Sequence, residues 1–559
     1  MKQEMDHKKI RIGDALIAAD LVSEYQIDII AQKQLITGEK FGELFLRMGI
    51  VSEYDIARLL GEQRSLAFSN VDEEPAPEAE ILDLFNQEFC LSRAFLPLRR
   101  EGNELIVVAG NVDYDEVEQA INQRTGLRCL ILQGEFSKVL RAIRYYYYFA
   151  SHPVQELCLK ESRRLEKDVD QVLTPDALLN HLFHLAVQQR ATDIHIQPEL
   201  KSFHIFFRID GVLRPVFAFS RKLQRLVASI KMQAGMDISD NIRPQDGSFS
   251  IAIIDMPFDI RVSTLITEFG ENIVLRLLPG GMQVSGLKQL GFFKKDLVLI
   301  DKLFANPYGI LLMTGPTGAG KSTTLHSGLR VSSMDSKNIL TVEDPIEYKL
   351  PLACQTQVNR KAGYFFDTAI THFLRHDPDV ILLGEIRDTE TAQAAITAAE
   401  TGHLVLSTLH VNTMLGVLSR FQALNIPSQM LADSLIGVIN QRLVRKICSF
   451  CRESYVPDEK ERRYLQGVSA EVLYRGRGCK HCLGTGYFGR TPVYEVLSIN
   501  AELSEMIAAK CSCAEIEKVI AASDFVPIEK MGLQLVIQGD TSLDELKRQL
   551  GRTMEGLIR

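Results

Sequence analysis

Residues 308–323 read YGILLMTGPTGAGKST, an apolar run that leads directly into a glycine-rich loop. The loop completes the pattern G-x-x-x-x-G-K-[ST] from Gly315 to Ser322, between a predicted strand and a predicted helix. Glycines let the backbone curl so that its N–H groups face phosphate oxygens, and the start of the helix adds partial positive charge. Lys321 can reach the terminal phosphates of a nucleotide, and the Ser322 hydroxyl can bind Mg²⁺. The predicted phosphate-binding residues are Gly315, Pro316, Thr317, Gly318, Ala319, Gly320, Lys321, Ser322 and Thr323.

Three further apolar runs are predicted strands with polar residues at their ends. These runs are residues 338–342, 379–383 and 404–409. The first ends at Glu343, the second is followed by Glu385, and the third lies between His403 and His410. Carboxyl ends of neighbouring parallel strands converge on the ligand crevice of an α/β sheet. Glu343 and Glu385 can therefore act on Mg²⁺ and on a water molecule, and we predict that the two histidines sense the nucleotide.

Two C-x-x-C pairs predict a metal site. Cys448 is paired with Cys451, and Cys479 with Cys482. Each pair forms a tight knuckle that presents two thiolates, and two knuckles complete a tetrahedral zinc site. A redox dithiol needs only one such pair in a thioredoxin-like context, which this sequence lacks. We therefore predict a structural Zn²⁺ bound by these residues.

The first 65 residues contain an internal repeat with an offset of 29 residues. Residues 12–14 (IGD) recur as 41–43 (FGE), and residues 22–25 (VSEY) recur as 51–54 (VSEY). Apolar residues in each copy fall at helical spacing, and the serine of each VSEY segment is placed to cap the following helix. Two copies are too few for a solenoid, so the pattern favours a small pseudo-symmetric bundle of short helices.

Composition excludes several classes of protein. The chain has 559 residues, of which 46% are hydrophobic and 24% charged, as in ordinary globular proteins, and this length suits several domains. Its net charge of −8 disfavours a nucleic-acid partner, since such proteins usually carry a basic excess. No run approaches the roughly 18 apolar residues of a membrane-spanning helix, and the N-terminus lacks the apolar region of a secretory signal. We therefore expect a cytoplasmic protein.

Residues 95–559 closely resemble the secretion ATPases that assemble type II secretion pseudopili and type IV pili. The resemblance rests on the glycine-rich loop, on the tetracysteine pairs and on several shorter segments. These segments are 341–347, 379–388 and 401–413, together with 193–195 (DIH), 208–211 (RIDG) and 244–247 (PQDG). It implies an α/β fold with a RecA-like P-loop ATPase core, a preceding PAS-like α+β domain and a helical and α+β N-terminal region. It also implies a homo-hexamer that binds ATP and Mg²⁺.

The resemblance also implies roles for residues near the nucleotide. Glu343 would activate the attacking water, Glu385 would act on Mg²⁺, and His403 and His410 would sense the γ-phosphate. Lys321 would hold the phosphates.

Arginines of the PAS-like domain reach the nucleotide in such ATPases, and Arg221, Arg276 and Arg208 occupy matching or nearby positions. Two positions depart from the family pattern, because Phe206 and Ser248 stand where many members carry arginine.

The N-terminal repeat resembles the paired-motif domain that binds cyclic di-GMP in some of these ATPases. Segments 11–14 (RIGD) and 40–43 (KFGE) match the two motifs, although Asp20 replaces a glycine expected in the first. The alternative is a helical docking module that binds no nucleotide. The predicted ligand contacts are Arg11, Gly13, Asp14, Gln32 and Gly42.

These observations predict five parts of the chain. They are a helical repeat domain (1–70), a small α+β domain (71–150), a linker (151–172), a PAS-like domain (173–285) and a RecA-like ATPase domain (290–559) with a zinc insert at 446–485. The leading hypothesis is a cytoplasmic hexameric ATPase, peripheral to the inner membrane, that drives pilus or pseudopilus assembly through a membrane platform protein. The alternatives are a nucleic-acid motor of the conjugation or DNA-uptake type and a non-catalytic nucleotide-binding scaffold.

Overall fold

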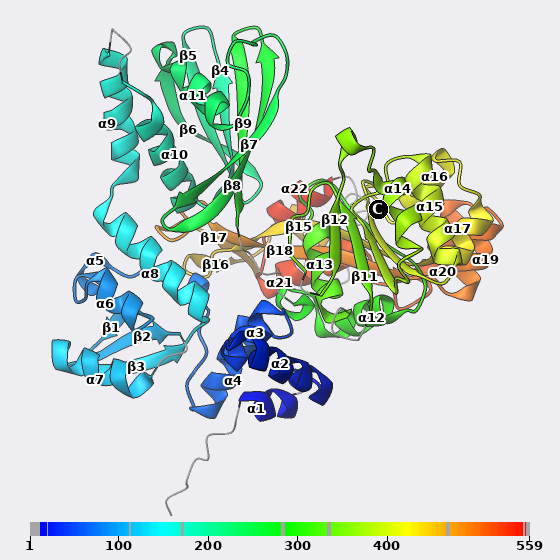
Figure 1. The fold of residues 1–559 in the computed structure, drawn as a ribbon, viewed down its shortest axis with the longest axis horizontal. Helices are drawn as coiled ribbons and strands as arrows, with labels where there is room; N and C mark the ends of the chain where they lie inside the picture. The colour runs from blue at the N-terminus through cyan, green and yellow to red at the C-terminus, as the bar shows by residue number, and fades with distance from the viewer. Residues whose placement is uncertain are drawn as a thin grey trace, which may run out of the picture. The chain divides into compact units, whose positions relative to one another are not determined.

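The computed structural model describes residues 12–19, 21–110, 113–168, 173–280, 286–332, 337–350, 352–465, 470–551 and 554. The chain forms two compact units, one of Met1–Ser52 with Gln283–Arg559 and the other of Glu53–Met282. Figure 1 shows the elements of both units, coloured from blue at the N-terminus to red at the C-terminus. Among the described residues, no helix is both long enough and apolar enough to cross a lipid bilayer.

The N-terminal repeat folds into short helices, as predicted. The first copy forms α1 (Ile12–Ala18) and α2 (Glu24–Thr37), and α3 (Phe41–Arg47) and α4 (Glu53–Gln63) begin 29 residues later. The side chain of Ser23 accepts a hydrogen bond from the Gln26 N–H and completes a capping box at the start of α2.

The two motifs of the repeat pack against each other. A Cβ on Gly13 would lie 3.3 Å from the Phe41 ring, and one on Gly42 would lie 3.8 Å from Ile12 Cδ1. The loop after α3 is buried within the same unit, where Arg330 Nε donates to the Gly49 carbonyl over 2.7 Å. The repeat up to Ser52 therefore belongs to the unit that also contains the glycine-rich loop, whereas α4 belongs to the other unit.

The second unit continues from α4 into a small α+β domain. Its elements are η1 (Val71–Glu73), α5 (Ala79–Leu82), α6 (Gln87–Ser92), β1 (Phe95–Glu101), β2 (Glu104–Ala109), α7 (Tyr114–Thr125), β3 (Arg128–Gln133) and α8 (Phe136–Ser151). The sheet has the order β1-β2-β3, with β1 antiparallel and β3 parallel to β2. α7 makes the crossover between the parallel strands, which a short turn cannot do.

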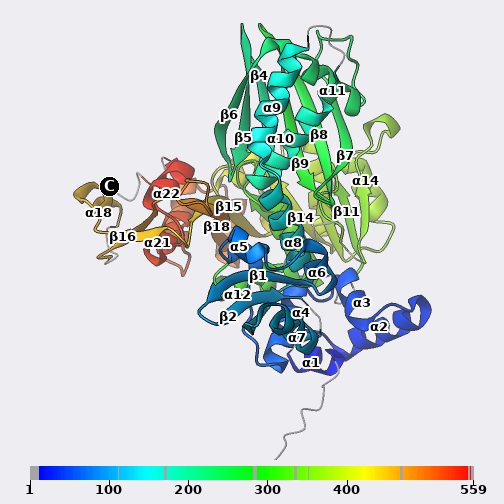
Figure 2. The same cartoon turned by 90° about the vertical axis from the view of Figure 1, so that its left-hand side faces the viewer.

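An antiparallel domain completes the second unit. Its elements are α9 (Val154–Lys167), α10 (Asp176–Gln188), β4 (Ala191–Pro198), β5 (Ser202–Ile209), β6 (Val212–Ser220), η2 (Arg221–Leu223), α11 (Arg225–Gln233), β7 (Asp246–Ile253), β8 (Met256–Thr267) and β9 (Gly270–Pro279). The strand order is β6-β5-β4-β9-β8-β7. Figure 2 shows α9, α10 and α11 along this sheet. The predicted linker contains α9, whose Val154, Cys158 and Leu165 are buried in the domain's core.

The first unit is built on a seven-stranded sheet of order β12-β11-β13-β14-β10-β15-β18, in which only β18 runs antiparallel to its neighbour. The strands are β10 (Gly309–Thr314), β11 (Ile339–Glu343), β12 (Cys354–Gln357), β13 (Val380–Leu383), β14 (Leu404–Leu409), β15 (Leu435–Ile447) and β18 (Tyr487–Ser498). Every residue of β10, β11, β13 and β14 is buried. This burial is typical of parallel strands that are covered on both faces.

Two hydrophobic cores lie on the two faces of this sheet. Leu311 and Met313 of β10 belong to one core, and Ile310 and Leu312 belong to the other. The first core takes residues from η3 (Leu287–Gln289), α12 (Lys294–Ala305), α13 (Lys321–Ser332), α21 (Ile528–Gln538) and α22 (Leu543–Leu550). The second takes residues from α14 (Phe366–Phe373), α15 (Thr389–Glu400), α16 (Gly416–Ala423), α17 (Ser428–Ser434), α19 (Ala501–Ala508) and α20 (Cys513–Ala521). The predicted α/β core is confirmed.

A short insert separates β15 from β18. It contains β16 (Arg452–Tyr455), α18 (Glu459–Tyr464) and β17 (Leu473–Gly476). The remaining short helix, η4 (Arg360–Ala362), follows β12 and is not part of the insert. β16 and β17 pair as a two-stranded antiparallel sheet. The C-x-x-C pairs flank this small sheet, as the sequence predicts for a zinc insert.

Candidate nucleotide site and metal centre

The glycine-rich loop connects β10 to α13 and packs closely on β15. Gly315 has a φ of +139°, and a Cβ there would lie 2.3 Å from the Gln441 carbonyl oxygen. Gly320 has a φ of +84°, and its Cβ would lie 2.9 Å from the Gln441 side chain. Side chains at either position would be strained and would also clash. The two glycines therefore keep the loop curled over the sheet edge, with the start of α13 behind it.

Lys321 lies buried inside this loop. Its Nζ donates to the carbonyls of Gly315 (2.8 Å) and Pro316 (3.0 Å). Burial lowers the pKa of Lys321 to about 8; the negative charge of Glu385 raises it, and the positive charge of Arg442 lowers it. A buried ammonium whose nearest partners are two neutral carbonyls is stabilised by a phosphate anion, which supplies the opposite charge.

His410 connects Lys321 to Glu385. Its Nδ1 lies 3.5 Å from Lys321 Nζ, and its Nε2 lies 3.4 Å from Glu385 Oε2. Burial lowers the pKa of His410, and the charge of Lys321 lowers it further. Arg387 lies 2.5 Å from the other oxygen of Glu385. The ends of β13 and β14 thus bring an acid and a histidine to the lysine of the loop, as the sequence predicts.

Glu343 ends β11 at the same edge of the sheet and is 4% exposed. Its Oε1 accepts hydrogen bonds from Thr341 Oγ1 (2.8 Å) and Gln355 Nε2 (3.1 Å). Its Oε2 lies 3.0 Å from Nε2 of His326 on α13. Two hydrogen bonds therefore hold one oxygen of this carboxylate, and His326 contacts the other.

Sequence reasoning missed residues of β15 that support the loop. Gln441 Nε2 donates to the Ala319 carbonyl (2.7 Å), and Gln441 Oε1 accepts from Thr324 (3.0 Å). Arg442 Nη2 donates to the Asn412 carbonyl over 2.6 Å. The available signal was the polar run Asn440-Gln441-Arg442, which follows the apolar first half of the strand. Buried polar side chains in such a strand need partners, and for Gln441 the loop supplies one.

His403 does not reach the loop. It precedes β14, and its carbonyl accepts from the N–H of Gly309 at the start of β10. The glycine-rich loop follows the other end of β10, roughly 20 Å away for a six-residue strand. The His403 ring instead contacts the Ala398 carbonyl and Thr401. Of the two predicted sensors, the structure brings only His410 to the site.

The three predicted arginines lie in the second unit and divide into two groups. Arg276 Nε donates to Asp193 over 2.9 Å, and Arg208 Nε lies 3.8 Å from the same carboxylate. Arg221 donates to the carbonyls of Leu200 and Phe269. Arg208 is near one end of β5, whereas Arg221 lies beside the other end, so the domain does not gather all three at one point.

The residues predicted to bind cyclic di-GMP are partly described. Arg11 lies outside the described residues. Gly13 and Gly42 form the contact between α1 and α3, while Asp14 and Gln32 are exposed on α1 and α2.

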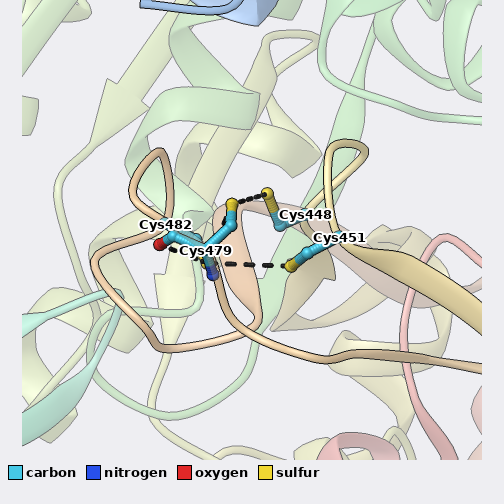
Figure 3. Close-up of side chains that lie close together, drawn as sticks. All are labelled: Cys448, Cys451, Cys479 and Cys482. Carbon is cyan, nitrogen blue, oxygen red and sulfur yellow. Dashed lines mark hydrogen bonds between the residues drawn. The ribbon is translucent and has the colours of Figure 1, made fainter.

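The cysteine cluster fits a tetrahedral metal ion. The sulfur atoms of Cys448, Cys451, Cys479 and Cys482 all lie within 4.8 Å of one another, and Figure 3 shows them converging from two loops. Three of the S···S distances are 3.7–3.8 Å. A zinc ion with Zn–S bonds of about 2.3 Å separates its ligands by about 3.8 Å in a tetrahedron.

Backbone groups around Cys482 stabilise its thiolate. The N–H groups of Cys479 and Gly486 both donate to its Sγ over 3.2 Å. Burial alone would raise the pKa of this thiol, but these hydrogen bonds bring it to about 7. Because a thiolate is the form that binds zinc, these hydrogen bonds suit Cys482 to the metal, whereas burial raises the pKa of the Cys448 and Cys451 thiols.

The family is shown by comparison of the sequence with known proteins. The sequence model of the family described as "Type II/IV secretion system protein" matches residues 168–548. The chain therefore belongs to this family, and its enzymatic activity is ATP hydrolysis. A second model, described as the MshEN domain, matches residues 65–152. That match covers the small α+β domain and lies almost entirely after the helical repeat.

Two relatives and one solved structure illustrate the similarity. The type II secretion system ATPase E of Vibrio cholerae is 43% identical over 374 residues, which is 66% of this chain and 74% of the relative. The type IV pilus assembly ATPase PilB of Thermus thermophilus is 34% identical over 541 residues, or 94% of this chain and 60% of the relative. The X-ray structure of the Legionella pneumophila ATPase DotB has a TM-score of 0.50 at 22% identity, covering 67% of this chain and 95% of that one. The last similarity concerns the fold, which is the predicted RecA-like core.

We predict that the purified protein contains about one Zn²⁺ per chain. Replacing Cys448 and Cys451 together with serine should remove the metal and lower the melting temperature, because a tetrahedral site cannot form from one knuckle. Elemental analysis and thermal unfolding measure the two effects. The matched control replaces Cys511 and Cys513, which lie outside the cluster, and should change neither. Metal-free protein with an unchanged melting temperature would contradict the prediction.

Proposed function

We propose that the chain hydrolyses ATP at the loop Gly315–Thr323, with Glu343 as the base that activates water. Lys321 and the loop N–H groups hold the phosphates, and His410 senses the γ-phosphate from the end of β14. Ser322 and Glu385 would hold Mg²⁺, which neutralises phosphate charge when bound. Among the predicted groups, His403 has no part in this arrangement.

The observation that supports this proposal is the pair of contacts that join both acids to the loop. Glu385 is joined to Lys321 through His410, and Glu343 is joined to the Ser322 backbone through His326. The two carboxylates lie at the ends of different strands, β11 and β13. Neither contact with the loop is needed to hold the sheet together. An acid on each side of the phosphate loop suits metal binding and water activation.

We also propose the setting in which this activity is used. The relatives named above suggest a homo-hexamer that drives assembly of a type IV pilus or a type II secretion pseudopilus. It would be cytoplasmic and would attach to the inner membrane through a platform protein and associated assembly proteins. Arg276 and Arg208, which lie together at Asp193, would contact nucleotide from the PAS-like domain, and Arg221 would do so from a separate position. The net charge of −8 disfavours the nucleic-acid alternative, and ATPase assays with and without single-stranded DNA test it.

We expect Lys321→Ala to lower ATP turnover at least about 100-fold, because the phosphates lose a preorganised positive charge. Glu343→Gln should lower turnover about 10²- to 10⁴-fold while leaving ATP affinity within a few fold, because only the water loses its base. Steady-state hydrolysis and equilibrium binding of labelled ATP separate the two effects. Glu390→Gln removes an exposed carboxylate on α15 and is the control. Wild-type turnover by Glu343→Gln would assign the base to another carboxylate.

We further propose that the N-terminal repeat binds cyclic di-GMP. The reciprocal contact of Gly13 with Phe41 and of Gly42 with Ile12 supports it, because the two motifs form one pseudo-symmetric surface. The match of the adjacent residues 65–152 to the MshEN domain also supports it. Arg11 would stack on a guanine base and pair with phosphate, which lysine cannot do equally well.

Arg11→Ala should weaken binding of cyclic di-GMP strongly, whereas Lys40→Ala should weaken it less. Isothermal titration of the full-length chain with cyclic di-GMP measures both. Absence of binding at about 100 μM ligand, which corresponds to about 5.5 kcal/mol, would leave the repeat as a docking module.

A further inference from the structure

His326 occupies an unusual position between the phosphate loop and Glu343. It lies on α13, five residues after Lys321, and its side chain is 3% exposed. Its Nδ1 lies 2.8 Å from the carbonyl oxygen of Ser322, and its Nε2 lies 3.0 Å from Glu343 Oε2. The same imidazole therefore contacts the helix that begins at the loop and the carboxylate that we propose as the base.

The hydrogen-bonding partners fix the tautomer of this ring. A carbonyl oxygen only accepts hydrogen bonds, so Nδ1 must carry a hydrogen and donate it to Ser322. With Nδ1 engaged in this way, Nε2 is the ring atom left to face Glu343. It lies 3.0 Å from Glu343 Oε2, and both side chains are almost fully buried.

The surroundings leave the ring little freedom to move. Tyr348 packs on the His326 ring with the ring centroids 5.3 Å apart, and its hydroxyl lies 3.1 Å from Thr323 Oγ1 on α13. Gln355 donates one hydrogen bond to Glu343 and another to the Tyr348 carbonyl. The segment after β11 is thus tied to α13 at two places, and His326 is the one that reaches the reacting carboxylate.

We propose that His326 is a positioning residue for ATP hydrolysis, which holds Glu343 at a fixed distance from the phosphate loop. Thr341 and Gln355 hold one carboxylate oxygen from the β11 side, and His326 holds the other from the α13 side. Because α13 begins at Lys321, this contact fixes the base relative to the phosphates rather than only relative to its own strand. This inference rests on the proposed role of Glu343.

Three substitutions separate the two contacts of the ring. His326→Phe keeps an aromatic ring against Tyr348 but loses both polar contacts. His326→Asn keeps a donor near the Nδ1 position, and His326→Gln keeps a donor near the Nε2 position. We expect kcat to fall about 10- to 100-fold in the Phe and Asn variants, with KM for ATP within about twofold. The reason is that a misplaced base slows the chemical step but does not weaken the binding of ATP. The Gln variant should recover most of the lost kcat.

A control on the same helix tests the alternative of a purely structural role. Ser327 is buried and donates to the Thr323 carbonyl over 2.7 Å, the same i to i−4 bond that His326 makes. Ser327→Ala should leave kcat within about twofold. Melting temperatures of all variants show whether each remains folded. If KM and melting temperature change together with kcat in the Phe variant, His326 has a structural role and the inference is wrong.

The double variant His326→Phe with Glu343→Gln makes the test decisive. If His326 acts through Glu343, the double variant should hydrolyse ATP as fast as Glu343→Gln alone. If the double variant is instead slower than Glu343→Gln by the factor that His326→Phe shows alone, the inference is contradicted. Wild-type turnover in the Glu343→Gln variant would overturn the proposed base. If the Glu343→Gln variant is slow but the His326→Phe variant keeps the wild-type kcat, only the positioning role of His326 is overturned.

Discussion

The nucleotide site depends on one geometric constraint, the common direction of the strands β11, β13, β14 and β10. Parallel strands that lie side by side end at one edge, so the residues that follow them meet there. Glu343 ends such a strand, and the Gly315–Ser322 loop, Glu385 and His410 follow others. The same constraint explains why His403 is distant, since it precedes its strand. Distance along the sequence is thus a poor guide to this site, and position relative to a strand end is a good one.

The loop in turn depends on β15, its neighbour on the other side of β10. The close approach of Gly315 to the Gln441 carbonyl leaves no space for a side chain, and the Gln441 side chain binds the loop at Ala319. His326 provides the same kind of support on the opposite side of the loop, where α13 meets β11. The phosphate loop is therefore supported from two directions by buried polar side chains. Such groups are costly to bury without partners, and both are engaged here: Gln441 makes hydrogen bonds to Ala319 and Thr324, and His326 Nδ1 makes one to Ser322.

The features that the sequence predicts well are those encoded by local spacing. The glycine-rich loop and the two cysteine knuckles carry their chemistry within a few consecutive residues, so their local conformation could be anticipated. Gln441 and His326 could not be identified in this way, because their roles come from tertiary contacts between distant elements. The arginines show a further limit, since positions that match a family pattern do not reveal that Arg221 and Arg276 lie apart within their own domain.

The most direct test of this account is a structure of the chain with Mg²⁺ and a non-hydrolysable ATP analogue. The account predicts the β-phosphate within hydrogen-bond distance of the N–H groups of the loop 315–323 and of Lys321. It also predicts that Glu343 contacts a water molecule in line with the γ-phosphate, at a heavy-atom distance of about 2.6–3.2 Å. A nucleotide bound at another edge of the sheet, or a different carboxylate on that water, would contradict it.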